Sequence, residues 1–222
     1  MKDEQAYITA YSSVARRSAC RNGNIVFQGD ENVNTGDFLT SLYKYLGADY
    51  PKLYKMDNLS RLGFLAVELL LTGRNLSENY NPEETGIVLS NANASLDADV
   101  NYMASVKNIP SPALFVYTLP NIVIGEISIR HHFKGENAFF VSEKFDEAFM
   151  HFYVTDLFSR AALKACICGW VECFRDDYKA VVWLVENNSR EGALPFTIDQ
   201  IHKSYLLSRS EEHTSELQSL AY

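Results

Sequence analysis

The sequence contains no hydrophobic run long enough to cross a bilayer, which takes about 20 consecutive apolar residues. Its longest uninterrupted apolar run, Ala180–Val185, has the length of a strand. No apolar signal region follows the N-terminal residues, so nothing in the sequence marks the chain for secretion. Four cysteines in 222 residues are too few for a disulfide framework and suit a reducing compartment. These absences predict a cytoplasmic protein that does not bind membranes.

Basic residues are in a minority, with 20 Lys and Arg against 28 Asp and Glu and a net charge of −8. Such a surface repels phosphate backbones, so nucleic acid is not expected as a partner. The sequence also lacks a glycine-rich phosphate loop, a Gly-x-Ser-x-Gly motif and a zinc-type His-Glu-x-x-His motif. The commonest sequence signals for nucleotide, serine-nucleophile and zinc enzymes are therefore missing.

Two short pairs of metal-ligand residue types remain. Cys166 and Cys168 are two apart in a predicted strand and point to one face, but a second pair of ligands is missing, so packed core thiols are favoured. His131 and His132 are neighbours near a predicted helix end, where adjacent side chains point about 100° apart. A favourable charge at the helix terminus fits this pair better than a metal site. No metal and no cofactor are expected.

The chain has ample material for a core, since 47% of its residues are apolar and 13% are aromatic. The predicted strands are Tyr7–Ser12, Ile25–Phe27, Gly86–Ser90, Ala138–Ser142, Ala165–Val171 and Ala180–Val185. The predicted helices are Asp37–Leu46, Asn58–Thr72, Asp97–Val106, Leu119–Ile127 and Phe145–Leu157. Apolar strands that alternate with amphipathic helices predict an α/β fold with a mostly parallel five-stranded sheet and helices on both faces.

The last residues are set apart by their sequence. Arg209–Ser219 reads Arg-Ser-Glu-Glu-His-Thr-Ser-Glu-Leu-Gln-Ser, which resembles the conceptual translation of a common sequencing-library adapter. The alternative is a genuine polar tail. We therefore expect one domain over residues 1–208, with residues 209–222 as an adapter-derived artefact without a defined fold. His213 and Glu216 consequently carry no functional weight.

The segment Ser111–Lys144 resembles the region that leads up to the nucleophile in β-ketoacyl-acyl-carrier-protein synthases of the thiolase-like superfamily. In those enzymes a Pro/Asn helix start, a small-residue helix and a Gly-Pro-Asn-type turn precede an apolar strand ending in Thr-Ala-Cys. Gly86–Asp99 resembles the family's preceding strand and loop, and Gly169–Glu172 falls where the family has Gly-Gly-Ala-Glu. The resemblance covers Tyr7–Glu186 and implies a thiolase-like half-fold. It fits best a short, divergent group of 3-oxoacyl-carrier-protein synthases found beside aryl-polyene and flexirubin-type pigment genes.

The sequence departs from this family at the nucleophile. Counting nine residues from Gly135 puts Lys144 at the position of the family's cysteine, with Ser142 and Glu143 adjacent. A helix N-terminus favours a thiolate, whereas it disfavours an ammonium. A lysine that attacked a thioester would also form a stable amide that does not turn over. A decayed site is therefore favoured, with Lys144 or Ser142 as an alternative nucleophile left open.

A second departure concerns the two histidines, or histidine and asparagine, with which the family stabilises the enolate. Only His202 stands in the native residues that follow the last predicted strand. The first hypothesis is thus a non-condensing synthase-like subunit of fatty-acid or polyketide (aryl polyene-type) biosynthesis. Its implied partners are an acyl-carrier protein, an active β-ketoacyl synthase subunit, or both. The alternatives are an acyltransferase with a nucleophile other than cysteine, and a plain interaction module.

The strand Ala138–Ser142 is the expected site of association. In the resembled family the strand before the nucleophile lies at the dimer edge, and here it carries neither charge nor proline. An exposed edge of this kind promotes aggregation unless a partner covers it. We therefore expect a homodimer, or a heterodimer with an active synthase.

Overall fold

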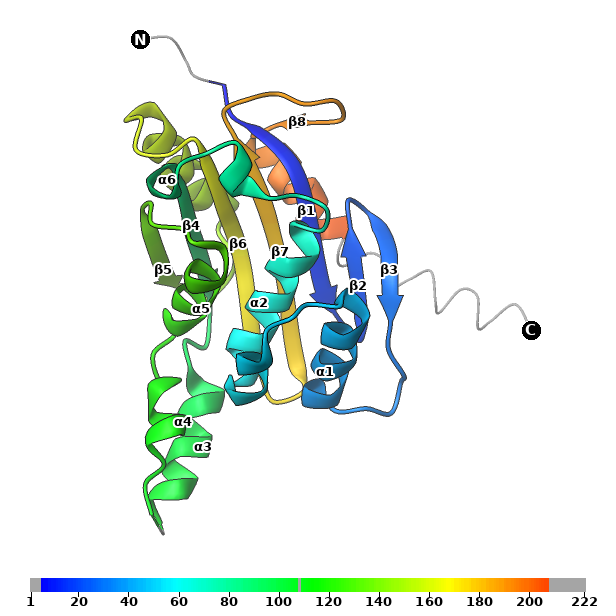
Figure 1. Ribbon diagram of the computed structural model, residues 1–222, viewed down its shortest axis with the longest axis vertical. Helices are drawn as coiled ribbons and strands as arrows, with labels where there is room; N and C mark the ends of the chain where they lie inside the picture. Colours follow the sequence, from blue (N-terminus) through cyan, green and yellow to red (C-terminus); the bar gives the residue numbers. More distant parts are fainter. Residues whose placement is uncertain (1–4, 108, 208–222) are drawn as a thin grey trace, which may run out of the picture.

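The computed structural model describes residues 5–107 and 109–207, and its centre is a twisted sheet of eight strands (Figure 1). The strands are β1 (Tyr7–Ala15), β2 (Ser18–Arg21), β3 (Asn24–Gln28), β4 (Thr85–Asn91), β5 (Asn137–Val141), β6 (Ala165–Phe174), β7 (Asp177–Glu186) and β8 (Leu194–Pro195). Their order across the sheet is β3-β2-β1-β7-β6-β4-β5, with β8 paired to β1. The strands β3 and β5 are therefore the two edges of this path. Residues 209–222, for which no defined fold was expected, lie outside the described residues.

The helices are α1 (Thr35–Leu46), α2 (Asn58–Leu70), α3 (Leu96–Val106), α4 (Pro112–Val116), α5 (Ile122–His131) and α6 (Glu147–Ser159), followed by helical residues 198–207. Short 3-10 turns occupy Pro51–Lys55, Leu76–Glu78 and Pro82–Glu84. The side chain of Asp57 caps the N-terminus of α2 by accepting a hydrogen bond from the Ser60 amide at 3.0 Å. Gly47 ends α1 in the left-handed region, at φ 62°. None of the helices described is both long and apolar enough to span a bilayer.

The prediction of a mostly parallel, five-stranded sheet is wrong. Only β4 pairs in parallel, with β5 on one side and β6 on the other, and every other pairing described is antiparallel. The reason lies in the turns. Residues 16–17, 22–23 and 175–176 form two-residue connections with positive φ angles at Arg16, Arg17, Asn22, Gly23 and Arg175. Connections this short can join only antiparallel neighbours.

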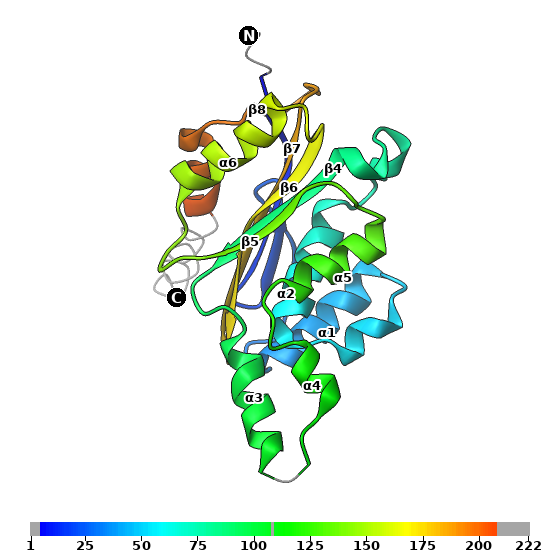
Figure 2. The ribbon, with the colours of Figure 1, turned by 90° about the vertical axis from the view of Figure 1, so that its left-hand side faces the viewer.

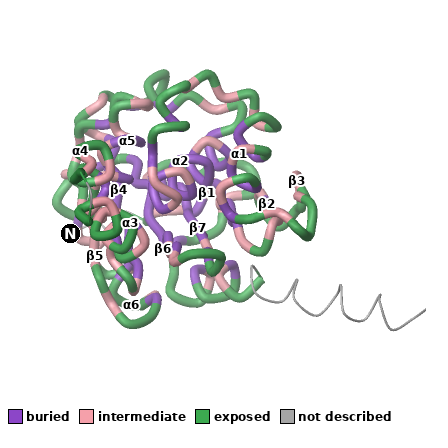
Figure 3. Tube along the Cα trace, turned by 90° about the horizontal axis from the view of Figure 1, so that it is seen from below, coloured by how far each residue is buried: buried purple, intermediate pink, exposed green. Residues whose placement is uncertain are grey.

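Helices cover both faces of the sheet (Figure 2). The larger core packs α1, α2 and α5 against one face, and α2 buries most of its length there. The smaller core lies on the opposite face, under α6 and residues 198–207, around the fully buried ring of Trp183. A Cβ atom at Gly63 would clash with the Val123 side chain, so this glycine permits the close approach of α2 and α5. Figure 3 shows the resulting buried centre.

The spacing of Phe145, Phe149, Phe152, Tyr153 and Leu157 predicts the inward face of α6, but the structure buries a different set. Phe145 is buried but precedes the helix, while Phe149 and Phe152 are 37% and 67% exposed. Leu157 is buried as predicted, and the residues that face the sheet beside it are Met150, Val154 and Phe158. Because apolar residues surround α6, their spacing alone did not identify its buried side. The spacing of Leu119, Ile122, Val123 and Ile127 likewise predicts one inner stripe, but Leu119 lies ahead of α5 and is 57% exposed.

The helices α3 and α4 form an arm that projects beyond the body of the molecule (Figures 1 and 2). Ala98 is the one buried residue of α3, and no residue of α4 is buried. The large apolar side chains exposed on and beside the arm are Leu96, Val100, Met103, Val106, Ile109, Phe115, Val116 and Leu119. An exposed apolar surface of this extent is uncommon on a monomeric protein.

Candidate functional site

The connection from β5 to α6 is where the family resemblance places a nucleophile. Lys144 lies in this connection, exposed, two residues ahead of the helix N-cap. The cap itself is Asp146, whose carboxylate accepts a hydrogen bond from the Phe149 amide at 2.8 Å. A carboxylate at this position is stabilised by the helix dipole and occupies one of the terminal N–H donors. The first turn of α6 therefore carries an acidic cap, and the ammonium of Lys144 stands outside it.

Ser142 and Glu143 are placed in the same connection. The Ser142 hydroxyl donates to the carbonyl oxygen of Lys144 at 2.9 Å, and its amide donates to the carbonyl oxygen of Asn91 at 2.9 Å. The hydroxyl proton thus faces a peptide oxygen, whereas an activated serine needs a base at that position. Glu143 is exposed beside it. The structure brings the three predicted residues together in sequence order but arranges no activated nucleophile among them.

A hollow of about 260 Å³ opens at the end of β5. Ser142 and Asp146 line one part of it, and Phe140 and Phe149 line another. The two phenylalanine rings meet edge to face, with their centroids 4.8 Å apart. The hollow is small and largely apolar, and no cysteine lines it.

All four cysteines are buried, and burial raises the pKa of Cys166, Cys168 and Cys173 well above the usual value of a thiol.

Cys166 and Cys168 are fully buried in the smaller core, as expected for packed thiols. Within the described part of the chain, no three His, Cys, Asp or Glu side chains gather as metal ligands would.

Sequence reasoning assigned no role to Glu172, but in the structure its side chain holds the backbone of the turn after β4. Its Oε2 accepts hydrogen bonds from the Ala92 and Asn93 amides at 2.6 and 3.1 Å. Glu172 of β6 thereby fixes the turn from which the α3–α4 arm leaves β4.

The buried side chain of Asn91 completes that turn. Its amide and its carbonyl oxygen bond both backbone groups of Ala94 at 2.8 and 3.0 Å, and Ala94 is held at φ 49°. Farther along, Ser95 Oγ donates to the carbonyl oxygen of Thr118 at 2.7 Å, which joins the two ends of the arm. The base of the arm is consequently rigid although its helices are exposed.

The β5 edge and the arm form one apolar side of the molecule, because α3, α4, α5 and β5 lie together there (Figures 1 and 2). Phe139 and Phe140 pack against opposite cores, while Val141 is 57% exposed. Exposed apolar residues continue through Phe115, Val116, Leu119 and Ile129. Within this side, positions 109–129 contain one charged residue, Glu126, which is buried, whereas α3 carries Asp97 and Asp99.

Glu126 is held inward by three side chains. Lys52 Nζ lies 2.8 Å from its carboxylate, and the hydroxyls of Tyr117 and Tyr50 donate to it at 3.3 and 3.5 Å. Burial, with the nearby Glu126 charge, raises the pKa of Tyr117 to about 12. The network ties the segment after α4 to the body and keeps the Glu126 carboxylate off the surface.

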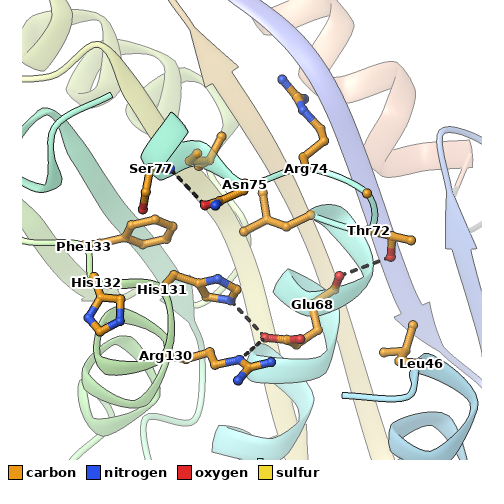
Figure 4. A pocket seen from close by; sticks show the side chains of 13 residues that line it. Leu46, Glu68, Thr72, Arg74, Asn75, Ser77, Arg130, His131, His132 and Phe133 are labelled. Atoms are coloured by element: carbon orange, nitrogen blue, oxygen red, sulfur yellow. Dashed lines mark hydrogen bonds and ion pairs between the residues drawn. The ribbon is translucent and has the colours of Figure 1, made fainter. Parts of the chain in front are cut away.

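A larger cavity, of about 560 Å³, lies at the C-terminal ends of α2 and α5 (Figure 4). There the Glu68 carboxylate is 3.1 Å from both Arg130 Nε and His131 Nε2. Burial alone would raise the pKa of Glu68, but these two partners hold it below its usual value. His131 and His132 point in different directions, and His131 stacks on Phe133, so the pair does not converge on a metal. Glu68, Arg130 and His131 are therefore engaged with one another, while Arg74, also in the lining, pairs with Glu186.

Neither a family model nor a curated protein matches this chain. Several solved structures, however, are similar to it. The ishigamide ketosynthase/chain length factor is similar with a TM-score of 0.59 and 17% identity, over 85% of this chain and 63% of that one. The ketosynthase (ApeO) in complex with its chain length factor (ApeC) from Xenorhabdus doucetiae gives 0.55 and 12%, over 83% and 80%. A beta-ketoacyl synthase from Burkholderia phymatum STM815 gives 0.56 and 11%, over 82% and 59%.

These similarities show that the fold resembles that of ketosynthases and chain length factors. The identities are too low to carry more than the fold. The chain spans 63% of the length of the ishigamide structure. Activity, substrate and partners are therefore matters for proposal.

Proposed function

We propose that the chain is a non-condensing, ketosynthase-like subunit that associates through β5 with a subunit of similar fold. The observation that carries this proposal is the uncharged, uncovered β5 edge, which continues into the apolar arm. A second copy or a cysteine-bearing β-ketoacyl synthase would add its own edge strand there and cover the arm. Such an interface should bury well over about 1,000 Å². The pairing of ketosynthase with chain length factor in similar structures supports the same proposal.

The non-condensing role is supported by the β5–α6 connection. Acyl transfer from a carrier-protein thioester requires an activated nucleophile. Here the described thiols are buried, the Ser142 hydroxyl bonds a peptide oxygen, and Lys144 stands outside the helix terminus. The acyltransferase alternative would need Ser142 or Lys144 to be rearranged. The chain would instead provide a surface that shapes the acyl chain held by an active partner, in fatty-acid or polyketide synthesis of the aryl-polyene type. A plain interaction module would use the same edge without any acyl ligand.

The association is tested by Val141→Lys, with Ile25→Lys as a matched control. Val141 on β5 and Ile25 on β3 are each 57% exposed on opposite edge strands. Sedimentation velocity of the wild type at micromolar concentration, alone and co-expressed with a cysteine-bearing β-ketoacyl synthase from the same genome, should show a dimer. Val141→Lys should shift this to monomer, because it places a charge in the seam, and Ile25→Lys should not. A wild type that stays monomeric under both conditions contradicts the proposal.

The missing nucleophile is tested by mass spectrometry of the intact protein after incubation with an acyl-carrier protein loaded with hexanoate. No acyl adduct is expected. An adduct on Lys144 or Ser142 that clears when malonyl-carrier protein is added would overturn the non-condensing role and establish the acyltransferase alternative.

A further inference from the structure

A third cavity, of about 450 Å³, lies on the face of the sheet covered by α6. It opens between the β5–α6 connection and helical residues 198–207. Its lining divides into two kinds of side chain. Aromatic rings make up one part, while Lys144, Glu147 and His202 contribute charged and titratable groups.

The aromatic part is a firm apolar floor. The rings of Phe145 and Tyr205 are 4.8 Å apart, and Trp170 meets Phe145 at 6.0 Å. Phe145 also stacks on the buried ring of Trp183, with an angle of 13° between the planes. Phe145 and Trp170 are 5% and 6% exposed, so both are fixed by the core beneath them. Such a floor suits an alkyl chain or an aromatic ring of a ligand.

The polar part contains a carboxylate–imidazole pair. His202 Nδ1 lies 3.1 Å from Oε1 of Glu147, and the two residues come from different helices. A carboxylate can only accept a hydrogen bond, so Nδ1 carries the hydrogen. In the neutral imidazole this leaves the lone pair on Nε2, where it can accept a proton. Glu147 therefore fixes the tautomer that a general base requires.

Lys144 supplies a cation to the same cavity. Its ammonium forms no ion pair with the other described residues, whereas Glu147 is engaged by His202. The remaining titratable neighbours are Glu143, which lines the cavity, and Lys179, whose Nζ lies 3.9 Å from the centre of the Tyr205 ring. A cation beside a general base can stabilise the negative charge that develops on a carbonyl oxygen under attack.

We propose that this cavity hydrolyses acyl thioesters, with His202 as the catalytic base and Glu147 as its positioning residue. Nε2 of His202 removes a proton from water as the water oxygen bonds to the thioester carbonyl carbon. The resulting oxyanion faces Lys144. Collapse re-forms the carbonyl, breaks the carbon–sulfur bond and releases a thiolate, which takes the proton back from His202. The products are a carboxylic acid and a thiol; one water is consumed, and no oxidant or reductant is needed.

The leaving group decides the substrate class. The His202–Glu147 pair, here called the dyad, provides one base but no separate acid to protonate the leaving group. A thiol has a pKa of about 8.5, so a thiolate departs without prior protonation, whereas an alkoxide does not. A thioester with an alkyl or aryl acyl chain therefore fits the base and the floor together. This activity goes beyond the proposed subunit role and does not depend on association through β5.

The test follows thiol release from the N-acetylcysteamine thioester of 3-phenylpropanoate by the full-length protein. The rate of thiol release by the wild type should exceed that of His202→Gln by about 100-fold, which is a common contribution of a general base. Glu147→Gln should lower kcat while leaving KM unchanged, because the aromatic floor remains. Trp170→Ala should raise KM instead. The corresponding oxygen ester should be hydrolysed far more slowly than the thioester.

His132→Gln is the matched control, since His132 is exposed at the C-terminus of α5 and lines neither the floor nor the dyad. It should retain the wild-type rate. Circular dichroism checks that each variant is folded, and Glu147→Gln tests the dyad from a second helix should His202→Gln misfold. Equal rates in wild type, His202→Gln and Glu147→Gln would overturn the proposal, as would a wild-type rate no higher than that of buffer.

Discussion

The two edges of the sheet are built differently. At one edge, β3 belongs to a ribbon of short antiparallel strands, and the register of β2 with β3 shifts between Ala19 and Cys20. Such an irregularity twists an edge and interrupts its row of hydrogen-bonding groups. At the other edge, β5 runs parallel to β4 in continuous register, from Asn137 beside Ile87 to Val141 beside Asn91. The β3 edge is protected by its own geometry, and the β5 edge is not.

The surroundings of the two edges differ in the same sense. Ile25 and Tyr45 are the large apolar residues exposed near β3, and the ring of Tyr45 packs against Phe27 at 5.0 Å. Near β5 the exposed apolar surface extends over α4 and α5 and onto Phe152 of α6. The proposed association would cover an edge that is unprotected and also apolar beyond the strand. The difference between the two edges therefore supports the proposed function.

The largest effect is expected from Glu172→Ala, which removes the anchor of the arm on the β5 side. Its Oε2 accepts hydrogen bonds from the Ala92 and Asn93 amides. Two amides left without an acceptor should cost about 1–3 kcal/mol and lower Tm by several degrees. The arm should lose its fixed exit from β4, and the dimer should dissociate in sedimentation. If the dimer persists unchanged, the arm does not take part in the interface.

A smaller effect, confined to the β3 side, is expected from Gly23→Ala. Gly23 has φ 80°, and a Cβ there would lie 2.9 Å from the Tyr11 hydroxyl. Thermal unfolding should show a loss of about 1 kcal/mol. The sedimentation coefficient should stay that of the wild-type assembly, because β3 is not the associating edge. Dissociation in this variant would remove the distinction between the edges.

The smallest effect is expected from Glu68→Gln, which touches neither edge. The pKa of Glu68 is held below its ordinary value, so its ionised form stabilises the fold at neutral pH and that contribution is lost as the pH falls through the lowered pKa. The difference in stability should be about 0.5 kcal/mol at pH 7 and should vanish in acid. A difference that grows in acid contradicts the ion pairs of Glu68, and dissociation would show that loss of stability alone separates the subunits.

The sequence predicted those helices and strands whose hydrophobic pattern and end signals lie within the element itself. The apolar run that became β4 is buried throughout, and the helix over Asp37–Leu46 ends at Gly47 as expected. Strand direction was missed, because the apolar content of β6 and β7 suits both parallel and antiparallel pairing. The deciding signal was the short turn at Asp176, which permits only a hairpin.

The candidate site was predictable only in part. Counting from Gly135 located the β5–α6 connection correctly, but it could not show that Asp146 would become the helix cap. The partner of His202 was also beyond the sequence, since Glu147 stands 55 residues away and meets it only when two helices pack on one face. The spacing of residues within one helix or strand can be predicted from the sequence, whereas contacts between distant elements depend on how the fold packs.

Hydrogen exchange at the two edges tests the central claim most directly. The Ser142 amide and the Glu136 carbonyl both bond to β4, so by alternation the amides of Phe139 and Val141 point away from the sheet. In the assembled protein these two amides should exchange slowly, and dilution or Val141→Lys should make them fast, while amides on the open side of β3 exchange rapidly throughout. Fast exchange of Phe139 and Val141 at every concentration, alone and with a synthase partner, would contradict the account.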